Sequence, residues 1–305
     1  MNRLICILGP TASGKTTLAA NLAALIKGEI ISADSRQVYK GMDIGTGKDL
    51  EDYTVGSIKI PYHLIDIKEP GYEYNVYEFQ NDFIDAFKLI EKNDNIPILC
   101  GGSGMYLDSI IRSYEMTKAN INYEFRNSLD GKSDDDLINL LKERVPLHNT
   151  SDTSSRERII RALEIANAKE DNTQKLSFLK SIKSVNFGVL FDRQTIRERI
   201  TDRLQSRLDN GMLDEIENLL NQGIKKDELI FYGLEYKYLT LHVLGKLTFA
   251  EMFDQLNTAI HQFAKRQMTW YRRMEKKGVH IHWIDGHLST DEKLALILNV
   301  VSKTY

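Results

Sequence analysis

The octapeptide "GPTASGKT" at residues 9–16 decides the fold of this chain, because a strand and a helix meet there. The apolar run "LICIL" at 4–8 precedes it, and the helical pattern "TTLAANLAALI" at 16–26 follows. Its G-x-x-x-x-G-K-[ST] spacing is typical of a loop whose backbone N–H groups and following helix N-terminus bind phosphate. In such a loop Lys15 carries a positive charge to the phosphates, and the Thr16 hydroxyl binds Mg²⁺. The predicted diphosphate and nucleotide site consists of Gly9, Pro10, Thr11, Ala12, Ser13, Gly14, Lys15 and Thr16.

Strand-like runs alternate with helical patterns through the first 116 residues. The runs "GEIISAD" at 28–34, "YHLIDI" at 62–67 and "IPILCGG" at 96–102 are interleaved with the helical pattern at 76–93. This alternation predicts a parallel sheet that is covered by helices on both faces.

Polar residues follow three of these strand-like runs. Asp34 comes after the second strand, Asp66 ends the third, and "GGSG" stands at 101–104. Ligands of parallel α/β sheets bind at the carboxyl ends of the strands, so we expect all three at the edge that carries the phosphate loop. A carboxylate beside bound phosphates indicates a base or a residue that supports magnesium.

The remainder of the chain divides into an insertion and a return to the sheet. Amphipathic helical patterns fill 117–185, and "NFGVLF" at 186–191 has strand character again. We therefore predict an α/β fold, a P-loop parallel-sheet core interrupted by a mostly helical insertion. Residues 1–116 and 186–305 would form the core with its C-terminal helices, and 117–185 the insertion.

Composition limits the possible partners and location. The 305 residues carry a net charge of −3, which argues against uniform coating of nucleic acid. Residues 260–278 nevertheless hold six basic side chains and one acidic one, which permits local binding of an anionic polymer. The two cysteines, Cys6 and Cys100, stand in apolar runs without metal-ligand spacing. With no leader pattern and no apolar run near 18 residues, we expect a cytoplasmic protein without membrane contact.

Six segments in order resemble bacterial tRNA dimethylallyltransferases: "GPTASGKTTLA", "ISADSRQVYKGMDIGTGK", "PYHLIDI", "ILCGGSGMYLDSII", "RIIRALEI" and "AKRQMTWYRR". The resemblance covers nearly the whole chain. It implies transfer of a dimethylallyl group from dimethylallyl diphosphate to N6 of the adenosine 3′-adjacent to the anticodon in tRNA, with release of pyrophosphate. It further implies Mg²⁺ as cofactor, no consumption of ATP, and the tRNA anticodon stem-loop as partner. We expect a monomer.

The resemblance also assigns the catalytic residues. Asp34 matches the family's proposed base, which suits an exocyclic amine whose lone pair is delocalised into the purine. Ser103 matches a threonine near the target adenosine and keeps its hydroxyl. Arg199 matches an arginine directed at the diphosphate. The resemblance assigns tRNA contacts to Asp34, Ser35, Arg36, Gln37, Ser103, Arg126, Glu157, Arg158, Ile159, Ile160, Arg161, Lys265, Arg266 and Trp270.

Departures from the family pattern concern the RNA-facing parts. A usual Asp-Pro pair reads Ser155-Arg156, a usual Met is Arg207, and "GYKE" reads "GLEY" at 233–236. Three alternatives remain open from the residues: an adenylate isopentenyltransferase that acts on a free nucleotide, an ATP-dependent P-loop kinase, and a non-enzymatic RNA-binding module. For the kinase, Asp66 would support the metal ion.

Overall fold

The computed structural model describes residues 2–145, 153–168 and 172–304. The chain forms two compact units, which are 1–113 with 179–305 (the core unit) and 114–178 (the insertion unit). The insertion unit ends at residue 178, before the expected boundary at 185. The strand that follows it begins at Lys183 rather than at residue 186. The parts of the insertion at 146–152 and 169–171 lie outside the described residues.

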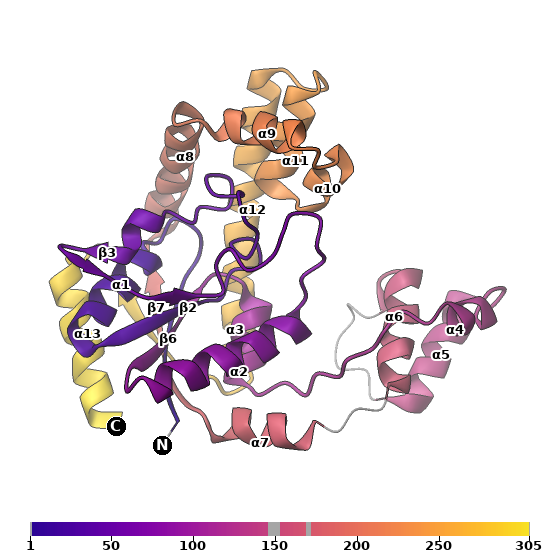
Figure 1. The fold of residues 1–305 in the computed structure, drawn as a ribbon, viewed down its shortest axis with the longest axis horizontal. Coiled ribbons are helices and arrows are strands. Elements are labelled where there is room, and N and C mark those ends of the chain that lie inside the picture. Colours follow the sequence, from indigo (N-terminus) through magenta and orange to yellow (C-terminus); the bar gives the residue numbers. More distant parts are fainter. Residues whose placement is uncertain (1, 146–152, 169–171, 305) are drawn as a thin grey trace. The chain divides into compact units, whose positions relative to one another are not determined.

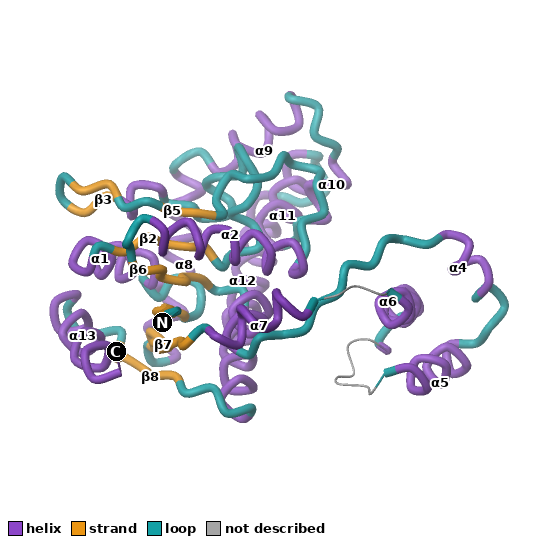
Figure 2. Tube along the Cα trace, turned by 60° about the horizontal axis from the view of Figure 1, so that its bottom comes forward, coloured by secondary structure: helices purple, strands orange, loops and turns teal. Residues whose placement is uncertain are grey.

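The core unit is built on a six-stranded sheet in the order β5-β2-β6-β1-β7-β8, with every neighbouring pair parallel. Figure 2 shows these strands side by side. A separate two-stranded antiparallel ribbon pairs β3 with β4. The strands are β1 Arg3–Leu8, β2 Gly28–Ser32, β3 Thr54–Val55, β4 Ile58–Lys59, β5 Tyr62–His63, β6 Ile96–Gly101, β7 Lys183–Leu190 and β8 Ile281–Asp285.

Helices cover both faces of this sheet, as the strand–helix alternation predicts, so the α/β fold class is confirmed (Figure 1). The helices are α1 Lys15–Ile26, α2 Val76–Lys92, α3 Gly104–Ile111, α4 Tyr123–Ser128, α5 Asp134–Arg144, α6 Arg156–Asn167, α7 Thr173–Ser181, α8 Arg193–Asp209, α9 Met212–Asn221, α10 Lys226–Phe231, α11 Leu234–Val243, α12 Phe249–Lys276 and α13 Thr290–Thr304, with a 3₁₀ turn η1 at Leu50–Tyr53.

The central strand shows why two helical layers are needed. Alternate residues of a strand face opposite sides, and in β1 every residue after Arg3 is buried. Ile5 and Ile7 belong to one core cluster with residues of α1 and α13, such as Leu18 and Ile297. Helix α2 contacts β2 and β6, and α3 packs against α2 and α12. Because both faces are apolar, polar groups gather at the strand ends.

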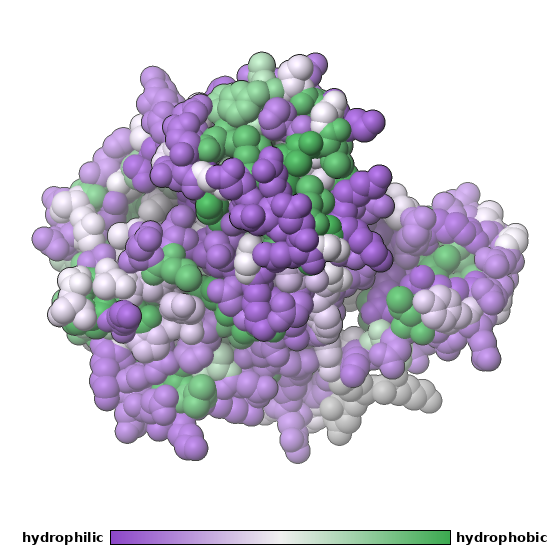
Figure 3. All heavy atoms as spheres, turned by 45° about the horizontal axis from the view of Figure 1, so that its top comes forward, coloured by the Kyte–Doolittle hydropathy of each residue, from purple (hydrophilic) through white to green (hydrophobic). Residues whose placement is uncertain are grey.

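A second core lies among the helices α8, α9, α11 and α12. It includes three residues of the loop after β2, namely Val38, Tyr39 and Met42. The loop that follows Asp34 is therefore part of the packed interior of these helices. Figure 3 shows one face of the molecule, on which apolar areas interrupt a hydrophilic surface. Phe231 of α10 and Phe249 of α12 are among the exposed large apolar side chains.

The insertion unit has a small core of its own. Leu129, Leu137, Leu141, Ile159 and Leu163 are buried together. Its helix α6 begins at the departure Ser155-Arg156, where the Ser155 hydroxyl accepts a hydrogen bond from the Arg158 N–H and so caps the helix. Arg156 donates to the carbonyls of Leu129 and Lys132 and so ties α6 to the segment before α5. The pair thus serves to start the helix.

The stretch "YHLIDI" is a much shorter strand than its sequence predicts. Only Tyr62 and His63 pair with β2, and the chain then turns at Leu64 and Asp66, both with positive φ. No helix in the described part of the chain is long and apolar enough to cross a membrane.

Candidate active site at the carboxyl edge of the sheet

The phosphate loop joins β1 to α1 and carries a hydroxyl and an ammonium group with few protein partners among the described residues. Gly14 stands at the N-cap of α1 with a φ of 76°. The Ser13 hydroxyl is buried and, within the described residues, has no hydrogen-bond partner. Lys15 Nζ reaches only the Pro10 carbonyl, at 3.5 Å, and burial lowers the pKa of this ammonium group. A partly buried cation near a buried hydroxyl at a helix N-terminus fits an anionic ligand.

Asp34 lies at the end of β2, two strands away from the phosphate loop. Its Oδ1 accepts a hydrogen bond from the Arg36 N–H at 2.9 Å, which closes a tight turn. The Ser103 Oγ accepts one from the Ser35 N–H at 3.0 Å and lies 3.4 Å from the Ser35 hydroxyl. The loops after β2 and β6 thus hold each other directly beside the Asp34 carboxylate.

The backbone of these two loops comes too close for a side chain. A Cβ on Gly101 would lie 2.2 Å from the Ala33 carbonyl oxygen, and the Ser103 N–H donates to that same oxygen. Glycine is therefore required where β6 passes the residue before Asp34. The strands before Asp34, "GGSG" and the phosphate loop are adjacent in the sheet, in the order β2, β6 and β1, as expected. Asp66, which was expected at the same edge, follows β5 on the other side of β2 and pairs with Lys48.

Helix α12 connects the phosphate loop to the loop after β6. Buried Gln267 accepts a hydrogen bond from the Thr11 N–H at 2.9 Å and donates to the Gly102 carbonyl at 2.9 Å. The Tyr271 hydroxyl donates to the Gly9 carbonyl at 3.0 Å. One turn away, the Trp270 indole lies against Gly104, and its buried Nε1 has no partner among the described residues.

Helix α8 supplies the cations beside the phosphate loop. Arg199 Nε donates to the Ala12 carbonyl at 2.9 Å, so this predicted residue does lie at the loop. Arg203 and Arg207 follow at intervals of four residues and therefore share its helix face. A cavity of about 10 Å³ between α8 and the loop is lined by both of these arginines and by Thr11.

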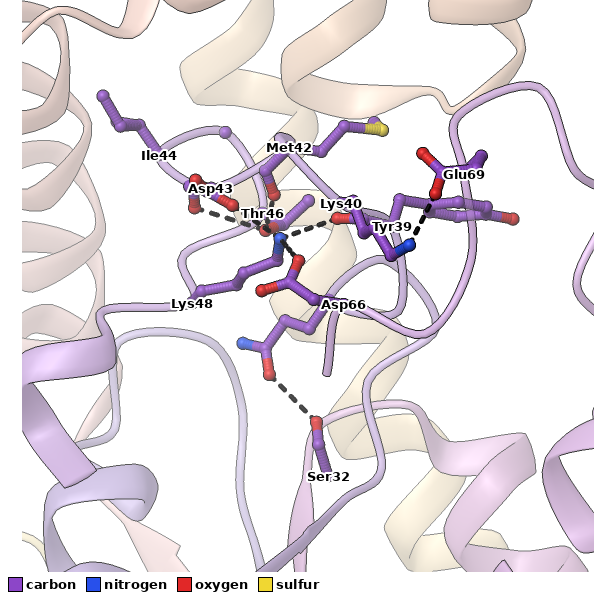
Figure 4. Close-up of polar contacts among 12 residues, drawn as sticks. Ser32, Tyr39, Lys40, Met42, Asp43, Ile44, Thr46, Lys48, Asp66 and Glu69 are labelled. Atoms are coloured by element: carbon purple, nitrogen blue, oxygen red, sulfur yellow. Dashed lines mark hydrogen bonds and ion pairs between the residues drawn. The ribbon is translucent and has the colours of Figure 1, made fainter. Parts of the chain in front are cut away.

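Asp66 is engaged in an ion pair. Its carboxylate pairs with the buried Lys48 ammonium group, which also donates to Asp43 Oδ1 and the Tyr39 carbonyl, each at 2.6 Å (Figure 4). The ion pair instead stabilises the loop after β2. Within the described residues, no group of three or more His, Cys, Asp or Glu side chains is placed to hold a metal ion. Thr16 is the second residue of α1, where its hydroxyl offers one oxygen ligand.

Four of the predicted RNA contacts in the core unit differ in environment. Arg36 lies over the Tyr232 ring, 5.5 Å from its centroid. Gln37 is 8% exposed, accepts from the Ser32 hydroxyl and donates to the Gly47 carbonyl, so its side chain serves the loop's interior. On α12, Lys265 and Arg266 are exposed.

In the insertion unit, two predicted RNA-binding arginines converge on one carboxylate. Arg126 donates to both oxygens of Glu164, at 2.8 and 3.0 Å, and Arg161 donates at 2.9 Å. The hydrogen bonds from Arg126 lead in lowering the pKa of the buried Glu164 carboxyl to about 2. Arg158 and Glu157 are exposed on α6.

The two predicted isoleucine contacts lie on the interior side of α6. Ile159 is 1% exposed in the core of the insertion unit, and Ile160 packs against that core. Burial removes the Ile159 side chain from any surface that a nucleic acid reaches.

A larger pocket, of about 700 Å³, lies between α8 and α12. Pro10 lines it at the start of the phosphate loop, and Phe191 and Met268 contribute apolar walls. Asp34, Ser103 and Lys15 are not among its lining residues. The chemistry-bearing groups therefore define the candidate site, and the pocket adjoins it.

Known proteins match this chain over most of its length. The family model described as IPP transferase matches residues 37–274, which is most of the chain. The chain belongs to the IPP transferase family. Its match begins after the phosphate loop and includes Gln37, both core-unit segments around Ser103 and Arg199, and helix α12 as far as Met274.

Relatives in the IPP transferase family match over almost their full length. A protein of Bacteroides fragilis named tRNA dimethylallyltransferase 2 is 52% identical, covering 96% of each chain. One of Phocaeicola vulgatus with the same name is 53% identical, covering 98% of this chain and 97% of that one. The solved tRNA isopentenylpyrophosphate transferase of Staphylococcus epidermidis is 27% identical, with a TM-score of 0.70 and 100% coverage of both chains.

Several site residues of this IPP transferase family member were missed by sequence reasoning. Gln267 and Tyr271 stand in the quoted segment "AKRQMTWYRR", but nothing in it distinguishes a side chain that faces a distant loop. Arg203 and Arg207 had a usable signal, because they continue the four-residue spacing from Arg199 along one helix face. Glu235 of "GLEY" lines the small cavity beside Arg207, and burial raises the pKa of its carboxyl.

Proposed function

We propose that the protein transfers a dimethylallyl group from dimethylallyl diphosphate to N6 of the adenosine 3′-adjacent to the anticodon in tRNA, and releases pyrophosphate. The observation that carries this proposal is the meeting of a phosphate loop, a carboxylate and a hydroxyl at three adjacent strand ends. The names of the relatives, which refer to tRNA, support the choice of acceptor.

The reaction needs one bond formed and one broken. N6 of the adenosine bonds to C1 of the dimethylallyl group while the C1–O bond to the diphosphate breaks, and the electron pair leaves with pyrophosphate. Asp34 takes the proton that N6 loses, because the delocalised amine is a poor nucleophile without a base. The loop N–H groups, Lys15 and Arg199 offset the charge that develops on the leaving group.

The acceptor base would lie near Ser103 and Trp270. The hydroxyl of Ser103 borders the Asp34 loop, and the Trp270 side chain, whose buried Nε1 has no partner among the described residues, lies against Gly104. A base from a single-stranded loop leaves its stack at low cost, which suits an anticodon loop. The exposed cations Lys265, Arg266 and Arg158 would contact phosphates.

A magnesium ion fits the oxygen donors present. The Thr16 hydroxyl would hold it together with diphosphate oxygens, since Mg²⁺ in phosphate sites uses few protein ligands. When bound, the ion supplies further positive charge to the leaving diphosphate. We also propose that the protein is a cytoplasmic monomer. Light scattering of the purified protein measures its mass and so tests whether it is a monomer.

One assay with three arms tests the function. The protein is incubated with labelled dimethylallyl diphosphate and an anticodon stem-loop RNA, with the same donor and free AMP, and with γ-labelled ATP and the RNA. We expect label only in the RNA of the first arm, on the adenosine 3′ of the anticodon. Label on AMP would establish the adenylate isopentenyltransferase, and phosphate transfer from ATP the kinase. No label in any arm would leave RNA binding as the function.

A further inference from the structure

Helix α8 carries a row of three arginines, and only the first is explained by the family resemblance. Arg199, Arg203 and Arg207 stand four residues apart on one face of the helix. Arg199 binds the Ala12 carbonyl of the phosphate loop. Arg207 adds a third guanidinium group to this face of the helix.

Asp49 holds the second and third arginines together. Its Oδ2 accepts from Arg203 Nη2 at 2.8 Å and from Arg207 Nη2 at 3.0 Å. A Cβ on Gly47 would lie 2.1 Å from Arg207 Nη2 and 2.5 Å from Arg203 Nη2. The glycine, with a φ of 64°, therefore makes room for two guanidinium groups side by side.

The backbone that carries Asp49 is anchored on both sides of Gly47. Lys48 is buried in its ion pairs, and Glu215 of α9 accepts from the N–H groups of Asp43, Ile44 and Gly45. Because these contacts hold the loop in place, the Asp49 carboxylate can fix the orientation of the arginines that bind it.

Charged groups of both signs surround this cluster. One carboxylate serves two guanidinium groups, and Lys15 stands close enough that both arginines contribute to the lowering of its pKa, after burial. Burial also lowers the pKa of Arg203, with Arg207 as the next cause. Glu235, whose pKa is raised by burial, and Asp52 also act on Arg203, and Asp34 acts on Lys15. Two guanidinium groups that share the Asp49 carboxylate favour an anion with several charges.

Donor capacity remains on both arginines. Each has five N–H donors, yet only Nη2 binds Asp49, and neither guanidinium makes another hydrogen bond within the described residues. The small cavity next to them is also lined by Thr11 and Ala12 of the phosphate loop. A bound diphosphate at that loop therefore has free guanidinium donors on the α8 side.

We propose that Arg207 is a further diphosphate-binding residue and that Asp49 is the positioning residue that orients Arg207, together with Arg203, toward the phosphate loop. The inference rests on the proposed function, because it assigns the diphosphate to this loop. Lys15 and three arginines of one helix would then bind the diphosphate of the prenyl donor and the product pyrophosphate.

Calorimetric binding of inorganic pyrophosphate with Mg²⁺ to the full chain tests the proposal without RNA. Arg207→Met should raise the Kd about tenfold, which is the scale of one lost charge-assisted contact. Asp49→Asn should raise it about threefold, and Asp49→Glu should restore part of the loss. In the Arg207→Met background, Asp49→Asn should have a smaller effect, because one of its two partners is gone.

Matched controls separate positioning from general damage. Arg193→Gln on the same helix and Asp209→Asn near its end should leave the Kd within twofold, and all variants should keep the wild-type Tm. Unchanged pyrophosphate affinity in Arg207→Met, with KM raised for the stem-loop RNA instead, would overturn the proposal and make Arg207 an RNA contact. Wild-type protein that binds no pyrophosphate would instead contradict the proposed function itself.

Discussion

The Ser103 hydroxyl accepts the Ser35 N–H at 3.0 Å, so the loop after β6 holds the loop that carries the proposed base. Ser103 is thereby both a neighbour of Asp34 and part of its support. A threonine at this position would keep the hydrogen bond, while an alanine would lose it.

Replacing Ser103 therefore separates position from chemistry. We expect Ser103→Ala to lower kcat about tenfold to a hundredfold, because a small displacement of the base is costly. Ser103→Thr should retain most of the activity. Steady-state rates with the stem-loop RNA measure both, and equal losses in the two variants would show that the shared hydroxyl is not the relevant feature.

Asp34→Asn tests the base directly. The amide accepts hydrogen bonds but cannot take the proton from N6, so kcat should fall about 10²- to 10⁴-fold. Pyrophosphate binding should persist, since Asp34 is not part of the phosphate loop. Single-turnover rates and calorimetry check the two expectations, and turnover near the wild-type level would refute the role.

Gln267→Leu tests the link from α12 to the two loops. Its loss leaves the Thr11 N–H without its partner, and the Gly102 carbonyl keeps only the Tyr271 hydroxyl at 3.3 Å. The free energy of unfolding should therefore fall by about 2 kcal/mol. The KM for dimethylallyl diphosphate should rise as the phosphate loop loosens. Gln255→Leu, at an exposed position of the same helix, is the control and should change neither urea unfolding nor KM.

The Glu164 cluster predicts a pH dependence of the insertion unit. The carboxyl has a pKa of about 2 in the fold, against a reference value of 4.5. A carboxyl whose pKa is depressed by folding stabilises above its unfolded pKa, and that stability is lost as the pH falls from 4.5 toward 2. Hydrogen exchange of α6 amides should therefore accelerate over this range, and Glu164→Gln should remove the dependence.

Arg161 and Arg158 should behave differently although they are three residues apart. Arg161→Ala breaks a bond to buried Glu164 and should destabilise the insertion unit by about 1–3 kcal/mol. Arg158→Ala should leave stability unchanged and reduce the salt dependence of RNA affinity by about one ion. If Arg161→Ala instead changes only the salt dependence of RNA affinity and leaves stability unchanged, Glu164 does not bind Arg161 in solution.

Local patterns were sufficient to predict the sheet, the phosphate loop and the amphipathic helices, because each depends on residues close together in the chain. The spacing of "GPTASGKT" requires a strand before it and a helix after it. Asp34 and "GGSG" followed from the rule that parallel strands end at one edge. The short strand at Tyr62 was overestimated because Leu64 and Asp66 turn the chain with positive φ, which an apolar run does not reveal.

Which side chains serve one another was decided only by the tertiary structure. The sequence alone marks Arg126, Arg161 and Asp66 as charges, but the fold gives them Glu164 and Lys48 as partners. It also brings Asp49 to Arg207, 158 residues further along the chain. Such pairings depend on how distant elements pack, since the energy of a charge is set by its burial and its neighbours. The sequence by itself determined a phosphate-binding α/β enzyme family, and the packing of α8 and α12 decided how its site is held.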